Sequence, residues 1–578
     1  MNRERKFDPI TLDILWRRLI SIVDEADAAV YRTSFSSLIR DAHDYTNAFF
    51  DRHGRELCEG SMVTPGQLGA LSLGVKSICT RYPEEAFRPG DILVSNDPWL
   101  LAGHLNDVGV ISPIFFKGRL AGFTACVFHH TDIGGRHGAD NREVYEEGVF
   151  IPLMKLCDAG VMNESLLQML RANVRKPDDV IGDLRSQIAA NHVCAQKVVE
   201  MMEETGLESL DELADEIIGR TERSMRQAVE AIPDGDYRYE GVIEGQGKRA
   251  DIKIRLAVHV SGSDVTVDFA GTDPQVGWGV NTVYNFTYSY VNFAFKSALN
   301  PEIPNNYGST LAVKVKAPEG SVVNCTYPAA VAHRTHVGHA LTEMVYLALA
   351  EALPERVLAE CGRAAGNTVV YGTRHNGERF LAMDLRAMGM GASYRSDGVH
   401  CFHFPSNASN TPCEILEGDT PFIVEKRAIL DDTGGAGRHR GGLGQEIVWR
   451  IPDDEYAPRP PVTVVNVMGR FRYAAKGLFG GREGAKSIYQ INGVDSDWGG
   501  QNLCKPGDVI RFCTPGGGGY GDPLERDEAA VRIDVLNGYV SAARAQSEYG
   551  VVIDPKTGEI DGEATRRLRE RLKRPAAK

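Results

Sequence analysis

Three histidines and two aspartates lie close together in the segment AGHLNDVGVISPIFFKGRLAGFTACVFHHTDIGG, residues 102–135. They are His104, Asp107, His129, His130 and Asp132. Zn²⁺ and Mn²⁺ both accept imidazole nitrogens and carboxylate oxygens, so H-x-x-D followed by HH indicates a candidate divalent-metal site. Such residues are also common as hydrogen-bonding groups at strand ends and in turns, and the spacing matches no established metal signature. The residues alone leave both interpretations open.

Two β-type runs must position these side chains, one on each side of the turn residue Gly118. If the runs pair as an antiparallel hairpin, Asp107 lies opposite His129, and His104 lies beyond the open end of the first strand. A register shift of one residue would put His130 there instead, because alternate side chains face opposite sides of a sheet. The sequence leaves this register open.

The rest of the chain predicts an α+β, multi-domain protein. Asp8-Pro9 is a suitable start for a helix that should reach about residue 31. A helical pattern returns near Asp183 and is broken by Pro233-Asp234-Gly235, after which strand patterns dominate. We expect three parts: an N-terminal mixed α/β metal-binding region over 1–232, a Gly-rich, strand-rich region over 233–523 with one helix near 337–353, and a helical C-terminal tail over 524–578.

Composition narrows the class of protein. The 578 residues carry a formal net charge of −14, which argues against a general nucleic-acid surface. The 11 cysteines are scattered without a C-x-x-C pair, so no disulfide framework or cysteine zinc ribbon is expected. The N-terminus lacks a signal-peptide pattern, and no apolar run approaches the roughly 20 residues that span a bilayer. We therefore expect a soluble, cytoplasmic protein that acts on a small molecule.

Two glycine-rich segments, GGAGRHRGGLG (434–444) and PGGGGYGDP (515–523), invite comparison with nucleotide-binding loops. Neither contains G-x-x-x-x-G-K-[ST], and neither stands in a strand–GxGxxG–helix context. We expect tight β turns with positive φ there, and no ATP site in this chain.

A second set of histidines, His333, His336 and His339, is spaced by threes. On a helix this spacing would resemble a metal site. Contact with a partner, or capping at the start of the helix near 337–353, is the favoured interpretation. Glu146 and Glu147 are conceivable general bases, but glutamates in such a context are usually solvated.

Several longer segments together resemble the hydantoinase B/oxoprolinase family. They are IRDAHDYTNAFFD (39–51), NDPW (96–99), AGHLNDVGVISPIF (102–115), FHHTDIGG (128–135), YEEGVFIP (145–152), DFAGTDPQV (268–276), PEIPNNYGS (301–309) and the two glycine-rich segments. The resemblance covers nearly the whole chain, in order. The family includes one of the two component chains of ATP-dependent N-methylhydantoinases and caprolactamases, part of 5-oxoprolinases, and components of acetone and acetophenone carboxylases.

The resemblance implies a metal held by His104, Asp107 and His129, with Asp44 as a further candidate ligand. It also implies a hydantoinase A-like partner that binds ATP and activates a carbonyl by phosphorylation. The expected activity is ATP-dependent hydrolysis of a cyclic amide, in which a water on Zn²⁺ or Mn²⁺ attacks the activated carbon. His130 or Asp132 would orient that water or hold a ligand imidazole.

Two other functions stay open at this stage. A ketone carboxylase of the acetone or acetophenone type would need nearly the same residues, because a metal can also stabilise an enolate-like species. The chain could instead be a non-catalytic scaffold for the ATP-binding partner. Some positions also depart from the family pattern: Gln67 stands where many members have histidine, and Leu101-Ala102-Gly103-His104 replaces a Gly-Gly-Thr-His run. None of these departures changes a candidate ligand, but they leave the substrate class open.

Overall fold

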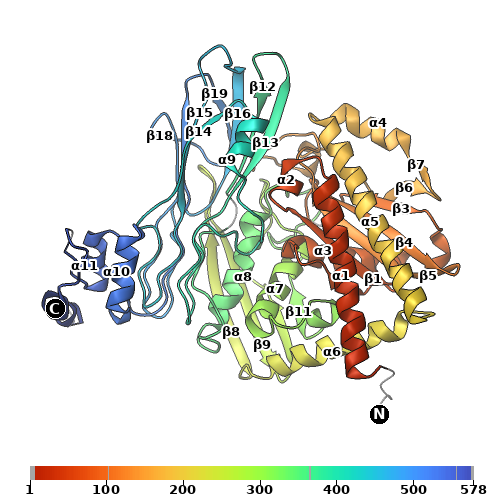
Figure 1. The fold of residues 1–578 in the computed structure, drawn as a ribbon, viewed down its shortest axis with the longest axis horizontal. Coiled ribbons are helices and arrows are strands. Elements are labelled where there is room, and N and C mark those ends of the chain that lie inside the picture. Colours follow the sequence, from red (N-terminus) through yellow and green to blue (C-terminus); the bar gives the residue numbers. More distant parts are fainter. Residues whose placement is uncertain (1–6, 102, 364–365, 555, 574–578) are drawn as a thin grey trace.

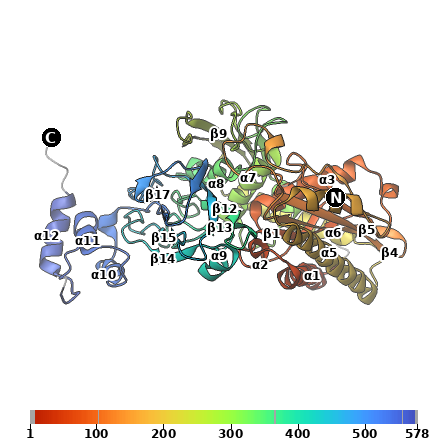
Figure 2. The same ribbon diagram turned by 90° about the horizontal axis from the view of Figure 1, so that it is seen from above.

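The computed structural model of the chain describes residues 7–101, 103–363, 366–554 and 556–573. As expected, the architecture is α+β and multi-domain. Figure 1 shows the N-terminal layers on one side, the C-terminal strands on the other, and the last helices projecting beyond those strands; Figure 2 gives the same order from above. Within the described ranges, no helix is long and apolar enough to cross a membrane.

A seven-stranded antiparallel sheet carries the candidate site. Its strands, in spatial order, are β2 (Glu56–Glu59), β1 (Tyr45–Asp51), β5 (Arg119–His129), β4 (Asp107–Phe116), β3 (Ile92–Ser95), β6 (Met154–Asp158) and β7 (Val161–Met162). Two long helices, α1 (Pro9–Thr33) and α5 (Pro177–Thr205), pack together on one side of this sheet, and α3 (Pro65–Arg81) packs on the other.

The alternation of apolar residues along the strands explains this layering. Phe49 packs into the cluster that contains α1 and α5, whereas the next residue, Phe50, packs against α3. Both phenylalanines are fully buried, as expected for a strand covered on both faces. The predicted helix start is confirmed, because the Asp8 carboxylate accepts hydrogen bonds from the amides of Ile10 and Thr11.

A second, four-stranded sheet follows the expected change of pattern near residue 232. Its order is β11 (Val313–Lys316), β10 (Asp264–Asp268), β9 (Ile252–Ser261) and β8 (Gly235–Ile243). The helices in this part of the chain and before it are α2 (Ser37–Arg40), α4 (Glu164–Asn173), α6 (Asp211–Val229), α7 (Tyr284–Leu299) and α8 (Thr335–Leu349).

The helix near 337–353 corresponds to α8, but the expectation of a single helix in this region is wrong. The segment YNFTYSYVNFAF, rich in aromatic and β-branched residues, forms α7. These side chains favour strands intrinsically. Helix α7 buries residues such as Phe286 and Tyr290 between α3 and α8, and this packing overrides the local preference.

Two further sheets face each other in the C-terminal half. One has the order β13 (Arg379–Arg386), β12 (Gly366–Thr373), β16 (Arg459–Val467), β19 (Gln501–Cys504); the other has the order β14 (Ile423–Ile429), β15 (Gln445–Arg450), β20 (Val509–Cys513), β17 (Ile488–Ile491), β18 (Val494–Asp495). Buried residues of both, including Val464 and Trp449, share one apolar cluster. The helix α9 (Cys413–Asp419) also contributes to this cluster through Leu416.

The chain ends in α10 (Glu528–Leu536), α11 (Ala542–Tyr549) and α12 (Gly562–Lys573), which match the expected helical tail. The domain boundaries near 232 and 523 stay predictions. The largest apolar cluster extends from α1 into the β8–β11 sheet, so the segments on either side of residue 232 are packed together.

The glycine-rich segments do not have the conformation that we expected. Across 434–444 and 515–523, which the structure describes in full, only Gly521 has a left-handed φ. The other glycines allow extended segments to pack backbone against backbone: a Cβ on Gly441 would lie 2.0 Å from the carbonyl oxygen of Gly517. Gly517 itself donates a hydrogen bond of 2.9 Å to the carbonyl of Gly442. Close approach, and not tight turns, explains the composition of these segments.

Candidate metal centre

The predicted ligands lie at neighbouring ends of three adjacent strands of the seven-stranded sheet, β1, β5 and β4. The hairpin β4–β5 has the register in which Asp107 pairs with His129, which settles the alternative left open by the sequence. On the other side of β5, β1 pairs Tyr45 with Phe128, so Asp44 enters beside His129. His104 lies three residues before Asp107, in the loop that leads into β4.

The ligand atoms of His104, Asp107 and His129 all lie within 4.8 Å of one another. His104 Nε2 is 3.0 Å from Asp107 Oδ1, and His129 Nδ1 is 3.6 Å from that oxygen. Asp44 Oδ2 lies 3.1 Å from His129 Nδ1. Ligands held about 2.0–2.2 Å from one Zn²⁺ are separated by about 3–3.6 Å, so these spacings suit a shared cation.

The hydrogen bonds of the two ring nitrogens of His104 give more specific support for a metal ligand. Its Nδ1 lies 3.0 Å from the carbonyl oxygen of Ala332, so Nδ1 carries the proton and donates. The remaining nitrogen, Nε2, is buried, faces Asp107 Oδ1 and has no hydrogen-bond partner among the described residues. Two acceptors at 3.0 Å repel each other unless a cation or proton lies between them. A backbone carbonyl behind a ligand histidine is also usual in metal sites.

Electrostatics favour the metal-binding forms of His104 and Asp107, whereas the Asp44 carboxylate favours the protonated form of His129. Burial and the nearby Arg334 guanidinium lower the pKa of His104 to about 4, so its imidazole is neutral. Burial opposes ionisation of Asp107, but the Arg334 guanidinium holds the pKa of Asp107 well below its usual range. Burial would lower the pKa of His129 as well, but the Asp44 carboxylate raises it overall. Arg334 forms an ion pair with Asp107 Oδ2, which leaves Oδ1 facing the two histidines.

Gln67, at a position where many members of the family have histidine, lies among the ligand carboxylates. Its amide nitrogen donates to Asp44 Oδ1 at 3.1 Å and to Asp107 Oδ1 at 3.3 Å. Thr46 Oγ1 donates to the amide oxygen of Gln67 and fixes its orientation. The glutamine therefore positions two candidate ligands.

A small cavity of about 70 Å³ adjoins the cluster and is lined by His104, His129 and Asp44. Glu147 also lines it and is only 5% exposed, so the expectation of a solvated side chain was wrong. Its Oε1 accepts from the amides of Val331 and Ala332 at 2.8 Å. Its Oε2 has no hydrogen-bond partner among the described residues.

Burial raises the pKa of Glu147 to about 8, although the two amides oppose the shift. A carboxyl with such a pKa and a free oxygen can exchange a proton near neutral pH. No spacing rule connects Glu147 with the hairpin. The only sequence signal for it is its place in the YEEGVFIP segment.

His130 and Asp132 do not join the cluster. The side chain of His130 is buried on the α5 side, where Nε2 donates to Gln187 Oε1 at 3.0 Å. The Asp132 carboxylate binds Arg175, with Nη1 2.7 Å from Oδ1, and lies 3.6 Å from His137 Nε2. His137 in turn lines the cavity, so Asp132 is connected to the site through that histidine.

His333, His336 and His339 do not all lie together in the structure. His333 and His339 line the cavity, and His339 packs on Tyr290 with 5.1 Å between ring centroids. His336 is buried elsewhere, between Trp278 and Trp498. Because His336 and His339 are buried, the interpretation as partner contacts is wrong for these two residues.

Fold and site together define an α+β protein with a buried histidine–carboxylate cluster beside a small cavity. The chain belongs to the hydantoinase B/oxoprolinase family, whose profile matches residues 8–523. This match confirms the resemblance recognised in the sequence.

Individual relatives align over nearly the full length. The chain is 32% identical to the B component of a putative D-/L-hydantoinase of Pseudomonas sp. (strain NS671), covering 98% of both chains. It is 31% identical to the beta chain of the caprolactamase of Pseudomonas jessenii over 96% of this chain and 98% of that one. The crystal structure of the ATP-dependent caprolactamase from Pseudomonas jessenii superimposes with a TM-score of 0.88, at 29% identity, over 98% of this chain and 100% of that one. A nucleotide-free acetone carboxylase shares the fold, with a TM-score of 0.88 at 20% identity, over 98% of this chain and 83% of that one.

Proposed function

We propose that the chain is the metal-binding B-type subunit of an ATP-dependent cyclic amide hydrolase. The observation that carries the proposal is the pair of buried acceptors, His104 Nε2 and Asp107 Oδ1, which face each other at 3.0 Å without hydrogen-bond geometry. Membership of the family supplies the reaction class, because relatives over the full length include a component of a hydantoinase and a component of a caprolactamase.

In this proposal His104, Asp107 and His129 hold Zn²⁺ or Mn²⁺, and Asp44 is the fourth protein ligand. A bound divalent cation would lower the pKa of water and polarise a substrate oxygen. Arg334 keeps Asp107 ionised, and Gln67 orients the two carboxylates. His130 and Asp132 act as positioning groups: His130 ties the end of the hairpin to α5, and Asp132 holds the loop that carries His137.

Glu147 is proposed as the proton carrier. Opening a cyclic amide breaks the carbon–nitrogen bond, and the departing nitrogen must gain a proton. The free Oε2 of Glu147 can take a proton from the attacking water and pass one to that nitrogen. Its Oε1 stays bound to two backbone amides, which fixes the carboxyl in the cavity wall.

The ATP-dependent step is assigned to a hydantoinase A-like partner. The relatives are themselves components of multi-chain enzymes, and neither glycine-rich segment has the sequence of a phosphate-binding loop. The partner would phosphorylate the amide oxygen and make the carbon a stronger electrophile. We also propose that the chain and this partner form a hetero-oligomer in the cytoplasm.

The test is to co-express the chain with its A-type partner and to follow ADP release. The panel contains hydantoins, 5-oxoproline, lactams and ketones, each with and without bicarbonate. We expect turnover with a cyclic amide in the absence of bicarbonate. Turnover only with a ketone plus bicarbonate would assign the chain to the carboxylases instead. Full activity of a complex that carries His104→Ala would indicate that the chain is a non-catalytic scaffold.

A further inference from the structure

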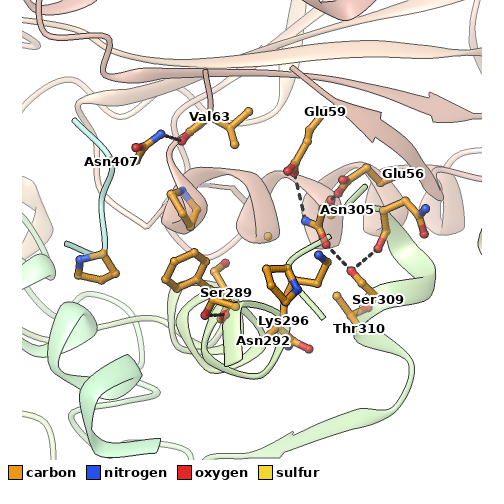
Figure 3. A pocket seen from close by; sticks show the side chains of 18 of the residues that line it. Glu56, Glu59, Val63, Ser289, Asn292, Lys296, Asn305, Ser309, Thr310 and Asn407 are labelled. Atoms are coloured by element: carbon orange, nitrogen blue, oxygen red, sulfur yellow. Dashed lines mark hydrogen bonds between the residues drawn. The ribbon is translucent and has the colours of Figure 1, made fainter. Parts of the chain in front are cut away.

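A second and much larger cavity, of about 600 Å³, lies between α3 and α7 and is also lined by residues of the segments 301–310 and 402–407 (Figure 3). It adjoins the small cavity, and His403 lines both. The proposed metal chemistry uses none of the acidic residues of the larger cavity. A cavity of this volume is large enough for a small organic ligand.

One end of the cavity is acidic because of an irregularity in β2. Glu56 and Glu59 both line it, although they are an odd number of residues apart on one strand. A register shift opposite Phe49 and Phe50 places Leu57 in a bulge, and a bulge turns the following side chains to the other face. The sheet edge therefore directs two carboxyl groups into one cavity.

Glu56 is the informative residue, because it is 3% exposed and only half satisfied. Its Oε2 is hydrogen-bonded to Ser72 Oγ, whereas the buried Oε1 has no hydrogen-bond partner among the described residues. Glu59 Oε2 accepts from Asn305 Nδ2 at 3.1 Å, as drawn in Figure 3. A buried carboxylate oxygen without a donor is costly, and a ligand that donates there would remove the cost.

The charges at this end do not balance when both carboxyls are ionised. Lys296 is the ammonium group that lines the cavity, and its Nζ donates to the carbonyls of Asn300 at 2.5 Å and Ile303 at 2.7 Å. It offsets one of the two negative charges, that of the buried Glu56 or that of the half-buried Glu59. Burial and the neighbouring Glu59 raise the pKa of Glu56, the response expected of a carboxyl that lacks a counter-charge.

Other parts of the cavity wall are apolar and include Phe293, Phe402, Phe404 and Pro405. The cavity thus offers both carboxyl groups and aromatic rings. A metal ion does not match this arrangement: among the described residues, the group of His, Cys, Asp and Glu close enough to share a cation is His104, Asp107 and His129.

We propose that this cavity binds a small organic ammonium ion, with the ammonium group at Glu56 Oε1 and the hydrocarbon part among the phenylalanines. The ammonium would donate to the free oxygen and supply the missing positive charge. The aromatic side chains of the cavity wall would take up the apolar part of the ligand. Binding requires neither metal nor ATP, so it is independent of the proposed reaction.

The first arm of the test uses the unmodified chain and two probes of nearly equal shape, hexylammonium and 1-hexanol, titrated calorimetrically at pH 8. We expect hexylammonium to bind at least tenfold more tightly, because both probes can donate to Glu56 Oε1 but only hexylammonium supplies a positive charge. Equal affinity, or tighter binding of the alcohol, would overturn the proposal. No variant is needed for this comparison, so a folding defect cannot obscure it.

The second arm compares Glu56→Gln with Glu302→Gln. Glu302 also lines the cavity but is exposed, so it serves as the matched control. We expect Glu56→Gln to lose at least tenfold in affinity for hexylammonium and to keep the affinity for hexanol, while Glu302→Gln changes neither. An unchanged hexylammonium affinity in Glu56→Gln, or the same loss in both variants, would contradict the proposed site.

Discussion

Replacing Arg334 with methionine tests whether Asp107 faces a cation. Asp107 is fully buried and Arg334 is 4% exposed, so their ion pair is shielded from water. Removing one partner of a buried pair costs about 3–5 kcal/mol, because the other charge stays buried and unpaired. We expect Arg334→Met to lose about this much stability when the protein is stripped of metal.

A bound metal should reduce that loss, because a cation held by Asp107 would supply a second positive charge. The assay is thermal unfolding of both proteins, once in chelator and once in excess Zn²⁺ or Mn²⁺. The stabilisation by metal should be larger in the variant than in the parent. The exposed pair of Arg17 and Asp13 provides the control, since Arg17→Met should cost less than about 1 kcal/mol in both buffers. An equal loss for Arg334→Met with and without metal would refute the reasoning.

Three further predictions concern other parts of the molecule. Glu147→Gln should lower kcat by about 10²–10⁴-fold and remove a titration near pH 8 from the rate profile, while metal content is retained; an unchanged profile would exclude Glu147 as the proton carrier. Burial raises the pKa of Asp27 to about 7, so ionisation of Asp27 should lower the free energy of unfolding as pH rises from about 4 to 7; Asp27→Asn should make this slope shallower and add up to about 4 kcal/mol at pH 8 in unfolding experiments. Gly441→Ala should lower the unfolding midpoint, because its Cβ would lie 2.0 Å from Gly517 O, whereas Gly277→Ala, with open space around it, should not.

Short-range patterns predicted the metal-site hairpin well. The turn at Gly118 and the two apolar runs predicted that β4 and β5 pair, but both strands are buried on both faces, so their apolar pattern left open whether His129 or His130 lies opposite Asp107. Because adjacent side chains of a strand point to opposite sides, only one of these two histidines can lie on the side of Asp107. The sequence could have excluded His130 as a ligand once the register was assigned.

Long-range packing was beyond such patterns. Arg334 is 227 residues from Asp107, and Glu147 is 184 and 185 residues from the two backbone amides that hold it. Helix α7 carries strand-favouring side chains and is helical because two other helices enclose it. The glycine-rich segments share this origin, because only the assembled fold shows that their glycines face other backbones.

The most direct test of the account is the metal content of the purified chain and two histidine variants, measured by elemental analysis. We expect about one equivalent of Zn or Mn in the parent protein and in His333→Ala, which changes a cavity histidine outside the cluster, and less than a tenth of that in His104→Ala. Full metal content in His104→Ala, or none in the parent protein after growth with both metals, would contradict the proposed centre.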